Sequence, residues 1–248
     1  SFQRVQVTAR AAAHLPLRSR HHVCGEALFA VDRISDPLRR MQALASLFPG
    51  LSLTEQEKAF TSLMSVAELA PAAHDRVRVL APLLAHLTSS ARDELLGHCF
   101  DLAMTVVEPY EQVSCLLSLA PYAGSRELKE ILRWIPNVSS TYGQALLLAG
   151  IAAFLPLELK EEALALAQGL ENSTGRVWAI EALVLADRGG SSRWGPQWRA
   201  ALESAALASH RSVLCLIALA DSSIAECGGP RGVDACIDAI QAVEKWWA

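Results

Sequence analysis

One segment of this chain returns every 36 residues, and this period limits what the chain can fold into. Four copies of the segment, each followed by an apolar stretch, begin at Arg4, Arg40, Arg76 and Gln112. A unit of this length is one supersecondary element that cannot bury its apolar face alone, so neighbouring units have to stack on one another. The period therefore predicts a repeat array.

Composition indicates that the repeating unit is helical. Apolar residues make up 52% of the 248 residues, Ala and Leu dominate, and the β-branched and aromatic types that fill strands are sparse. We expect one continuous all-α domain over 1–248, with regular repeats over 1–123 and shorter, irregular repeats over 124–248. The next two copies begin at Arg176, 64 residues after Gln112, and at His210, 34 residues later, and we attribute both shifts to shortened loops.

Each repeat reads as two antiparallel helices. Residues 54–69 predict a first helix, with Thr54 as its cap, and residues 73–87 predict a second helix with apolar side chains at helical spacing. Asp36-Pro37 and Glu108-Pro109 are typical helix starts, with an acidic cap followed by Pro in the first turn. We expect first helices near 24–35, 54–69, 90–107, 125–135, 157–170, 196–208 and 232–246. We expect second helices near 4–14, 37–48, 73–87, 109–121, 141–155, 174–187 and 210–226.

The repeat class is HEAT-like. The residue signatures that define tetratricopeptide and ankyrin repeats do not recur in this chain. HEAT repeats are two-helix units of similar length with a loose apolar pattern, which fits these units better. The predicted fold is a right-handed α-solenoid of about seven antiparallel helix pairs, one of them incomplete. The first copy of the segment lacks a preceding helix, so we expect this chain to be a fragment of a longer protein.

A more specific resemblance lies in the segment from Arg40 to Pro49, Arg-Met-Gln-Ala-Leu-Ala-Ser-Leu-Phe-Pro, with Asp36 four positions before it. It resembles the repeats in the C-terminal arms of bacterial STAND NTPases, which are signalling and defence ATPases with a NACHT-like switch module. The resemblance implies a sensor or docking arm whose ligand is a protein. The chain contains no Gly-x-x-x-x-Gly-Lys-Ser/Thr segment, so any ATPase would belong to another part of the protein.

Charge, apolar run length and cysteine content limit the kinds of partner and the cellular environment that we expect for this chain. The formal net charge is −4 and basic residues are scattered, so the basic stripe of a nucleic-acid groove is missing. No apolar run reaches the roughly 18 to 20 residues of a membrane-spanning helix. The six cysteines are spread through helical segments rather than arranged as a disulfide framework, which fits a reducing, cytoplasmic environment.

Three motifs contain residue types that can bind a metal, attack a substrate or bind an anion. His21-His22-x-Cys24 offers three metal ligands but lacks the fourth that a structural zinc site needs. His98 and Cys99 are adjacent on a helix and point about 100° apart, so they cannot act as base and nucleophile. The loop from Gly228 to Gly232 could cradle an anion, but an ordinary helix connection is the simpler interpretation. We expect no catalytic residue, no metal and no cofactor, and Cys24, Cys99 and Cys115 are predicted to be core residues.

Candidate partner-binding residues are therefore surface features. Trp194 and Trp198 lie one turn apart, and either form an exposed platform or staple their loop onto the stack. Arg40, Arg76 and Arg176 recur at the start of second helices, and either bind acidic partner groups or pair with the preceding turn, for example Arg40 with Asp36. The sequence thus predicts a non-catalytic scaffold or sensor arm that binds another protein. The alternative is a regulatory domain or subunit of an enzyme whose catalytic part is absent from this chain.

Overall fold

The computed structural model describes residues 2–186, and every regular element within this range is a helix. The prediction of an all-α fold is confirmed for this part of the chain. The helices predicted over 196–208, 210–226 and 232–246 lie outside the described residues. The chain divides into two compact units, Ser1–Tyr122 and Ala123–Ala248, and the boundary falls where the regular 36-residue period ends.

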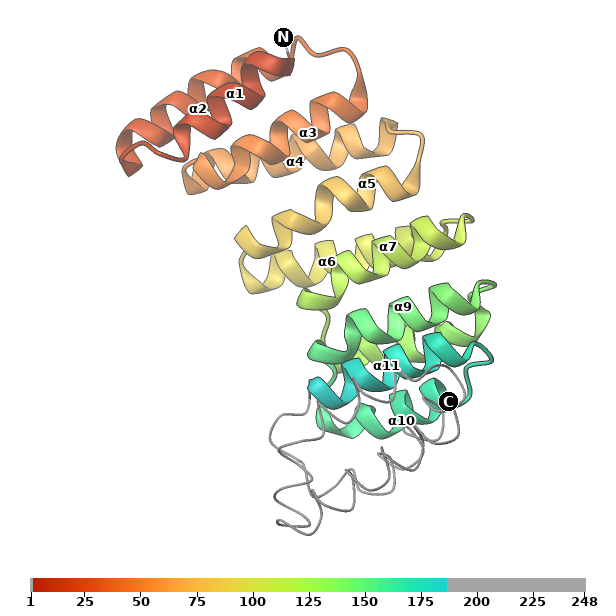
Figure 1. Cartoon of the computed structure of the whole chain (residues 1–248). Coiled ribbons are helices and arrows are strands. Elements are labelled where there is room, and N and C mark those ends of the chain that lie inside the picture. Colours follow the sequence, from red (N-terminus) through yellow and green to blue (C-terminus); the bar gives the residue numbers. More distant parts are fainter. Residues whose placement is uncertain (1, 187–248) are drawn as a thin grey trace, which may run out of the picture. The chain divides into compact units, whose positions relative to one another are not determined.

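In the first unit, second helices pack against one another in series. α1 contacts α3, α3 contacts α5, and α5 contacts α7, and each of α3, α5 and α7 also contacts the first helix next to it. Figure 1 shows α3, α5 and α7 following one another on one side of this unit. The second helices are α1 (Phe2–Ala12), α3 (Pro37–Leu47), α5 (Ala73–Leu80) and α7 (Pro109–Leu119). The first helices are α2 (Leu17–Val31), α4 (Leu53–Leu69) and α6 (Ser89–Met104).

The second unit continues the same alternation. Its second helices, α9 (Thr141–Ile151) and α11 (Ser173–Leu185), pack closely against each other. Its first helices are α8 (Ser125–Trp134) and α10 (Leu157–Gln168), which also contact each other. Within residues 2–186, short 3-10 turns follow five helices: η1 (Phe48–Gly50), η2 (Ala81–His86), η3 (Ala120–Tyr122), η4 (Ile135–Asn137) and η5 (Ala152–Phe154).

The helix starts follow from local signals in the sequence. Asp36 caps α3, since its carboxylate accepts the Arg39 backbone N–H at 2.7 Å, and Pro37 occupies the first turn as predicted. The prediction of Thr54 as the cap of α4 is wrong, because the helix begins one residue earlier and Ser52 is the cap. Glu55 accepts the Ser52 backbone N–H at 2.9 Å, which is the acidic half of a capping box.

The fourth residue of most helices ties that helix to the turn before it. In seven helices it is an Arg or Gln that donates to a preceding backbone carbonyl: Arg20, Gln56, Arg76, Arg92, Gln112, Gln144 and Arg176. Arg92, for example, donates from Nε to the Leu84 carbonyl at 3.0 Å and from a terminal nitrogen to the Leu87 carbonyl at 3.2 Å. These carbonyls lie at or just after the end of the previous helical segment, so the side chains add donors at a place where the regular backbone hydrogen bonds of the helix stop.

The change of period after residue 123 comes from the first helices and not from the loops. α2, α4 and α6 have 15, 17 and 16 residues, whereas α8 and α10 have 10 and 12. The connection after α6 (residues 105–108) and the one after α10 (residues 169–172) have the same length. Our expectation of shortened loops is therefore wrong within the described residues. The first helices have lost about one turn of 3.6 residues, which shortens the repeat from 36 residues to 32.

Candidate functional site

An open pocket of about 210 Å³ lies between α5 and α7 in the first unit, and we call it the α5–α7 pocket. Side chains one helical turn apart line it, because residues three and four apart share one face of a helix. α5 and the turn after it contribute His74, Arg78, Ala81 and Pro82. α7 contributes Glu111, Ser114, Cys115 and Ser118, and η3 contributes Pro121 and Tyr122.

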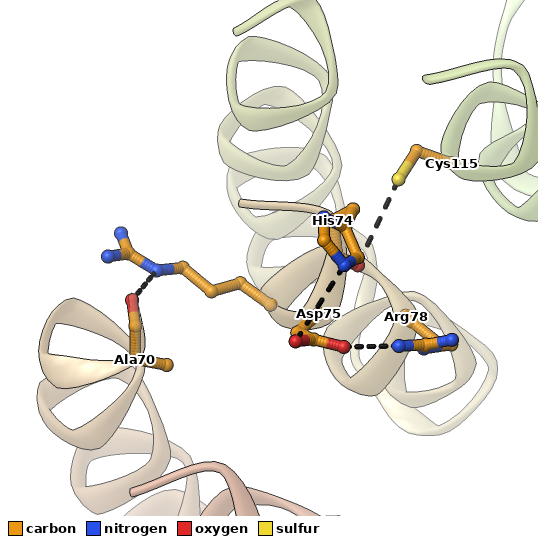
Figure 2. A network of polar contacts seen from close by, with 6 residues as sticks. Ala70, His74, Asp75, Arg78 and Cys115 are labelled. Carbon is orange, nitrogen blue, oxygen red and sulfur yellow. Dashed lines mark hydrogen bonds and ion pairs between the residues drawn. The ribbon is translucent and has the colours of Figure 1, made fainter. Parts of the chain in front are cut away.

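The charged groups of this pocket are arranged unevenly. Arg78 pairs with Asp75 one turn before it, and His74 Nε2 lies 3.8 Å from the other carboxylate oxygen of Asp75 (Figure 2). The Asp75 carboxylate thus neutralises the Arg78 guanidinium. Glu111 makes no ion pair within residues 2–186. Glu111 is therefore the carboxylate of the pocket lining that has no cationic partner within the described residues.

Cys115 forms the floor of the pocket and is not equipped to act as a nucleophile. Its side chain is 4% exposed and its Sγ lies 3.9 Å from the His74 carbonyl oxygen (Figure 2). Burial, with a further contribution from the Glu111 charge, raises the pKa of the Cys115 thiol to about 11. The thiolate is the reactive form, so at neutral pH this thiol is almost entirely in its unreactive, protonated form.

The other two described cysteines are also core residues, as predicted. Cys99 is fully buried in α6, and burial raises the pKa of its thiol to about 12. Cys24 is 1% exposed, and desolvation raises its pKa as well. A Cβ built on Gly50 would collide with the Cys24 Sγ, so this cysteine fills the contact between α2 and η1. Inert, buried thiols are typical of packing residues rather than of catalysts.

The second unit carries a pair of exposed aromatic rings. Tyr142 in α9 and Trp178 in α11 are 49% and 42% exposed, and their ring centroids are 5.9 Å apart with the planes tilted by 39°. This geometry is within the range of favourable aromatic pairs. Glu181 lies three residues after Trp178 on the same side of α11, and burial raises the pKa of its carboxyl. Rigid, amphipathic rings held in this way are suited to contact a partner.

The arginines predicted to bind a partner are engaged inside the chain. Arg76 donates from Nε to the Ala70 carbonyl at 2.6 Å, and Arg176 donates to the Leu170 carbonyl at 3.0 and 2.7 Å. The predicted pairing of Arg40 with Asp36 is wrong. Arg40 instead contacts Asp32 at 2.7 Å, because the Asp36 carboxylate caps α3. Internal contacts thus hold all three guanidinium groups.

The remaining sequence motifs fall into two groups. Trp194, Trp198 and the loop from Gly228 to Gly232 lie outside the described residues. The residues of the His21-His22-x-Cys24 motif diverge, since Cys24 is buried whereas exposed His22 lies 3.5 Å from Glu26. Among residues 2–186, no group of three His, Cys, Asp or Glu side chains is arranged to hold a metal ion.

Sequence reasoning did not identify the α5–α7 pocket, although the period contains a signal for it. Asp75 and Glu111 are 36 residues apart and are both the third residue of their helix, α5 and α7. In the first unit, a surface residue of one second helix and the residue 36 positions later lie at equivalent positions on neighbouring second helices. The period therefore aligns Asp75 with Glu111 in the same way as it aligns Arg40 with Arg76.

Comparison with known proteins gives no match to a protein-family model, to a curated protein or to a solved structure. Within the described part of the chain, none of the helices has the length and apolarity required to cross a membrane.

Proposed function

We propose that this chain is an α-solenoid of HEAT-like repeats that acts as a non-catalytic arm for binding another protein. Two features support this architecture. First and second helices alternate through residues 17–185, and successive second helices contact one another within each unit. The recurring Arg or Gln at the fourth position gives each helix the same junction with the turn before it. Stacked units of this kind expose long surfaces, which such proteins use for recognition.

The proposed setting is the one implied by the resemblance to STAND NTPases. In that setting the chain would be the ligand-recognition arm of a bacterial signalling or defence ATPase in the cytoplasm. Two observations are consistent with a non-catalytic role: burial raises the pKa of the Cys99 and Cys115 thiols, and the α5–α7 pocket is open and small. A catalyst would instead need a nucleophile or base with an adapted pKa in a larger, enclosed site.

The observation that carries the proposal is the exposed pair of Tyr142 and Trp178. Trp and Tyr are among the residue types most enriched at binding hot spots, where truncation costs about 2 kcal/mol or more of binding free energy. Burying these two exposed rings removes apolar surface from water at little cost in side-chain entropy, because each ring already rests on the other.

The test is a comparison of matched variants. The parent chain, the Tyr142→Ala/Trp178→Ala double variant and the Phe29→Ala variant serve as baits for crosslinking in a bacterial lysate. Any captured protein is then purified and its binding measured by calorimetry. Phe29 is 80% exposed, lies in the other unit and controls for loss of an exposed aromatic ring.

We expect the double variant to bind the purified partner at least about 30-fold more weakly than the parent, which corresponds to about 2 kcal/mol. Phe29→Ala should bind as the parent does. Equal binding by the parent and the double variant would remove the aromatic pair from the recognition surface. Absence of any specific protein partner would contradict the proposed function itself.

A further inference from the structure

We propose that the α5–α7 pocket receives a single basic side chain of the partner protein, an arginine in preference to a lysine. This proposal rests on the proposed function, because it assigns a specific contact to the protein partner. The size of the pocket, its charge and the chemistry of its walls all favour such an occupant.

The volume of the pocket indicates how much of a ligand it can hold. Pockets that enclose drug-sized molecules or cofactors typically measure about 300 to 1,000 Å³. The α5–α7 pocket, at about 210 Å³, is below this range and is open to solvent. It fits one side chain projecting from a partner surface better than a separate small molecule.

The charges around the pocket favour a cation. Arg78 is already paired with Asp75, so the Arg78 guanidinium is not available as the main receptor for an anion. Glu111 lies on the opposite wall, is partly buried, and makes no ion pair within the part of the chain that the structure describes. A carboxylate in this state gains more from an incoming cation than a fully solvated one, because the local dielectric is lower.

The chemistry of the walls fits the whole length of an arginine side chain. Ala81, Pro82 and Pro121 provide an apolar surface for its methylene groups, and the Tyr122 ring is available for a cation–π contact. Ser118 uses its hydroxyl proton for the Cys115 carbonyl at 2.7 Å, so the oxygen of that hydroxyl is free to accept from a donor. A planar guanidinium with five N–H donors can bind the Glu111 carboxylate in a bidentate way and still reach Ser114 or Ser118.

The experiment uses peptide probes and the complete chain. Acetyl-Gly-Gly-Arg-Gly-Gly-amide is titrated into isotope-labelled protein, and amide chemical shifts in α5 and α7 are followed. The same peptide with citrulline in place of arginine is the neutral analogue of nearly the same shape, and peptides with lysine or glutamate test the sign and form of the charge. Glu111→Gln is the test variant. Glu162→Gln, which makes the same change of charge at an exposed position on α10, is its control.

We expect the arginine peptide to shift resonances of the α5–α7 pocket and the citrulline peptide to have no such effect. Lysine should bind more weakly, and Glu111→Gln should weaken arginine binding about tenfold, the usual effect of losing one charge-assisted hydrogen bond. Glu162→Gln should bind as the parent does.

Three results would overturn the proposal: equal binding of arginine and citrulline peptides, unchanged binding by Glu111→Gln, or preference for the glutamate peptide. None of these results would affect the proposed protein-binding function, which depends on the Tyr142 and Trp178 test. Conversely, arginine binding in the pocket without any protein partner would contradict the proposed function and leave the chemistry of the pocket established.

Discussion

A close helix contact in the second unit provides a quantitative test of the packing between α9 and α11. Gly175, the third residue of α11, faces α9, and a Cβ built on it would lie 2.9 Å from the Ala145 Cβ. Carbon atoms in favourable contact are about 3.5 to 4.0 Å apart, so Gly175→Ala would leave the two atoms about 0.6 to 1.1 Å too close. Neither Cβ belongs to a flexible side-chain end. The two helices would therefore have to move apart.

The expected cost is the balance of two effects. Overpacking a well-packed contact typically costs about 1 to 3 kcal/mol, whereas Gly to Ala in a helix gains about 0.5 to 1 kcal/mol. We expect Gly175→Ala to lower the free energy of unfolding by about 1 to 2 kcal/mol. Gly97, which is exposed on α6 and has no atom within 4 Å of a built Cβ, provides the matched control. Gly97→Ala should raise stability by about 0.5 to 1 kcal/mol.

A double-mutant cycle separates the clash from other effects. Ala145→Gly alone should destabilise by about 1 kcal/mol, mainly through helix propensity. In the Ala145→Gly/Gly175→Ala double variant the new Cβ meets a position that no longer has one, so the clash is absent. Urea unfolding followed by circular dichroism should therefore give a favourable coupling of about 1 to 2 kcal/mol between the two sites. Strict additivity, or stabilisation by Gly175→Ala alone, would refute the close approach of α9 and α11.

Three further measurements test other parts of the structure. Arg92→Met should lower the free energy of unfolding by about 1 to 3 kcal/mol, because the Leu84 and Leu87 carbonyls lose their side-chain donor. Arg126→Met changes a side chain that is 85% exposed and should have little effect in the same urea assay. Hydrogen bonds from Ser52 lower the pKa of Glu55 below its ordinary value of 4.5. The negative charge of Glu55 therefore stabilises the fold above that pH, and this stabilisation is lost as the pH falls through the pKa of the folded state. The difference in Tm between the parent and Glu55→Gln should therefore be largest near neutral pH and vanish in acid; a difference independent of pH would contradict this role. Alkylation of Cys115 at about pH 8, followed by mass spectrometry, should be much slower in the native chain than in urea. At a pKa of about 11, only about one thiol in a thousand is ionised at this pH. Equal rates in the two conditions would show that the thiol is accessible.

Local signals in the sequence were sufficient to predict most of the described helices. The dipeptides Asp36-Pro37 and Glu108-Pro109 are short-range signals, and the helices begin where they predict, although only Asp36 caps its helix through the side chain. The cap of α4 was predicted wrongly as Thr54, whereas Ser52 holds that position. Ser52 and Thr54 both have suitable hydroxyl groups, and the position of Glu55 three residues after Ser52 decides between them.

Side-chain partners were harder to predict, because they depend on how the chain returns on itself. Arg40 had an acidic neighbour at Asp36, but that carboxylate is used by the helix start, and Arg40 reaches Asp32 across the connection instead. Predicting the α5–α7 pocket requires knowing which face of α5 meets which face of α7. The sequence period contains that information only once the helix bounds are known, since it then aligns Asp75 with Glu111.

The same separation in sequence has different structural meanings in the two units. In the first unit, 36 residues connect identical positions of neighbouring second helices, as for Asp75 and Glu111, each the third residue of its helix. In the second unit the first helices are about one turn shorter, so identical positions are 32 residues apart. Tyr142 and Trp178 are nevertheless 36 residues apart, and they are the second residue of α9 and the sixth of α11. Their rings therefore meet diagonally, offset by one turn, whereas residues with the same separation in the first unit lie at the same level. The length of the intervening first helix thus determines which surface residues of the second helices become neighbours, and a period read from the sequence predicts a binding surface only when that length is known.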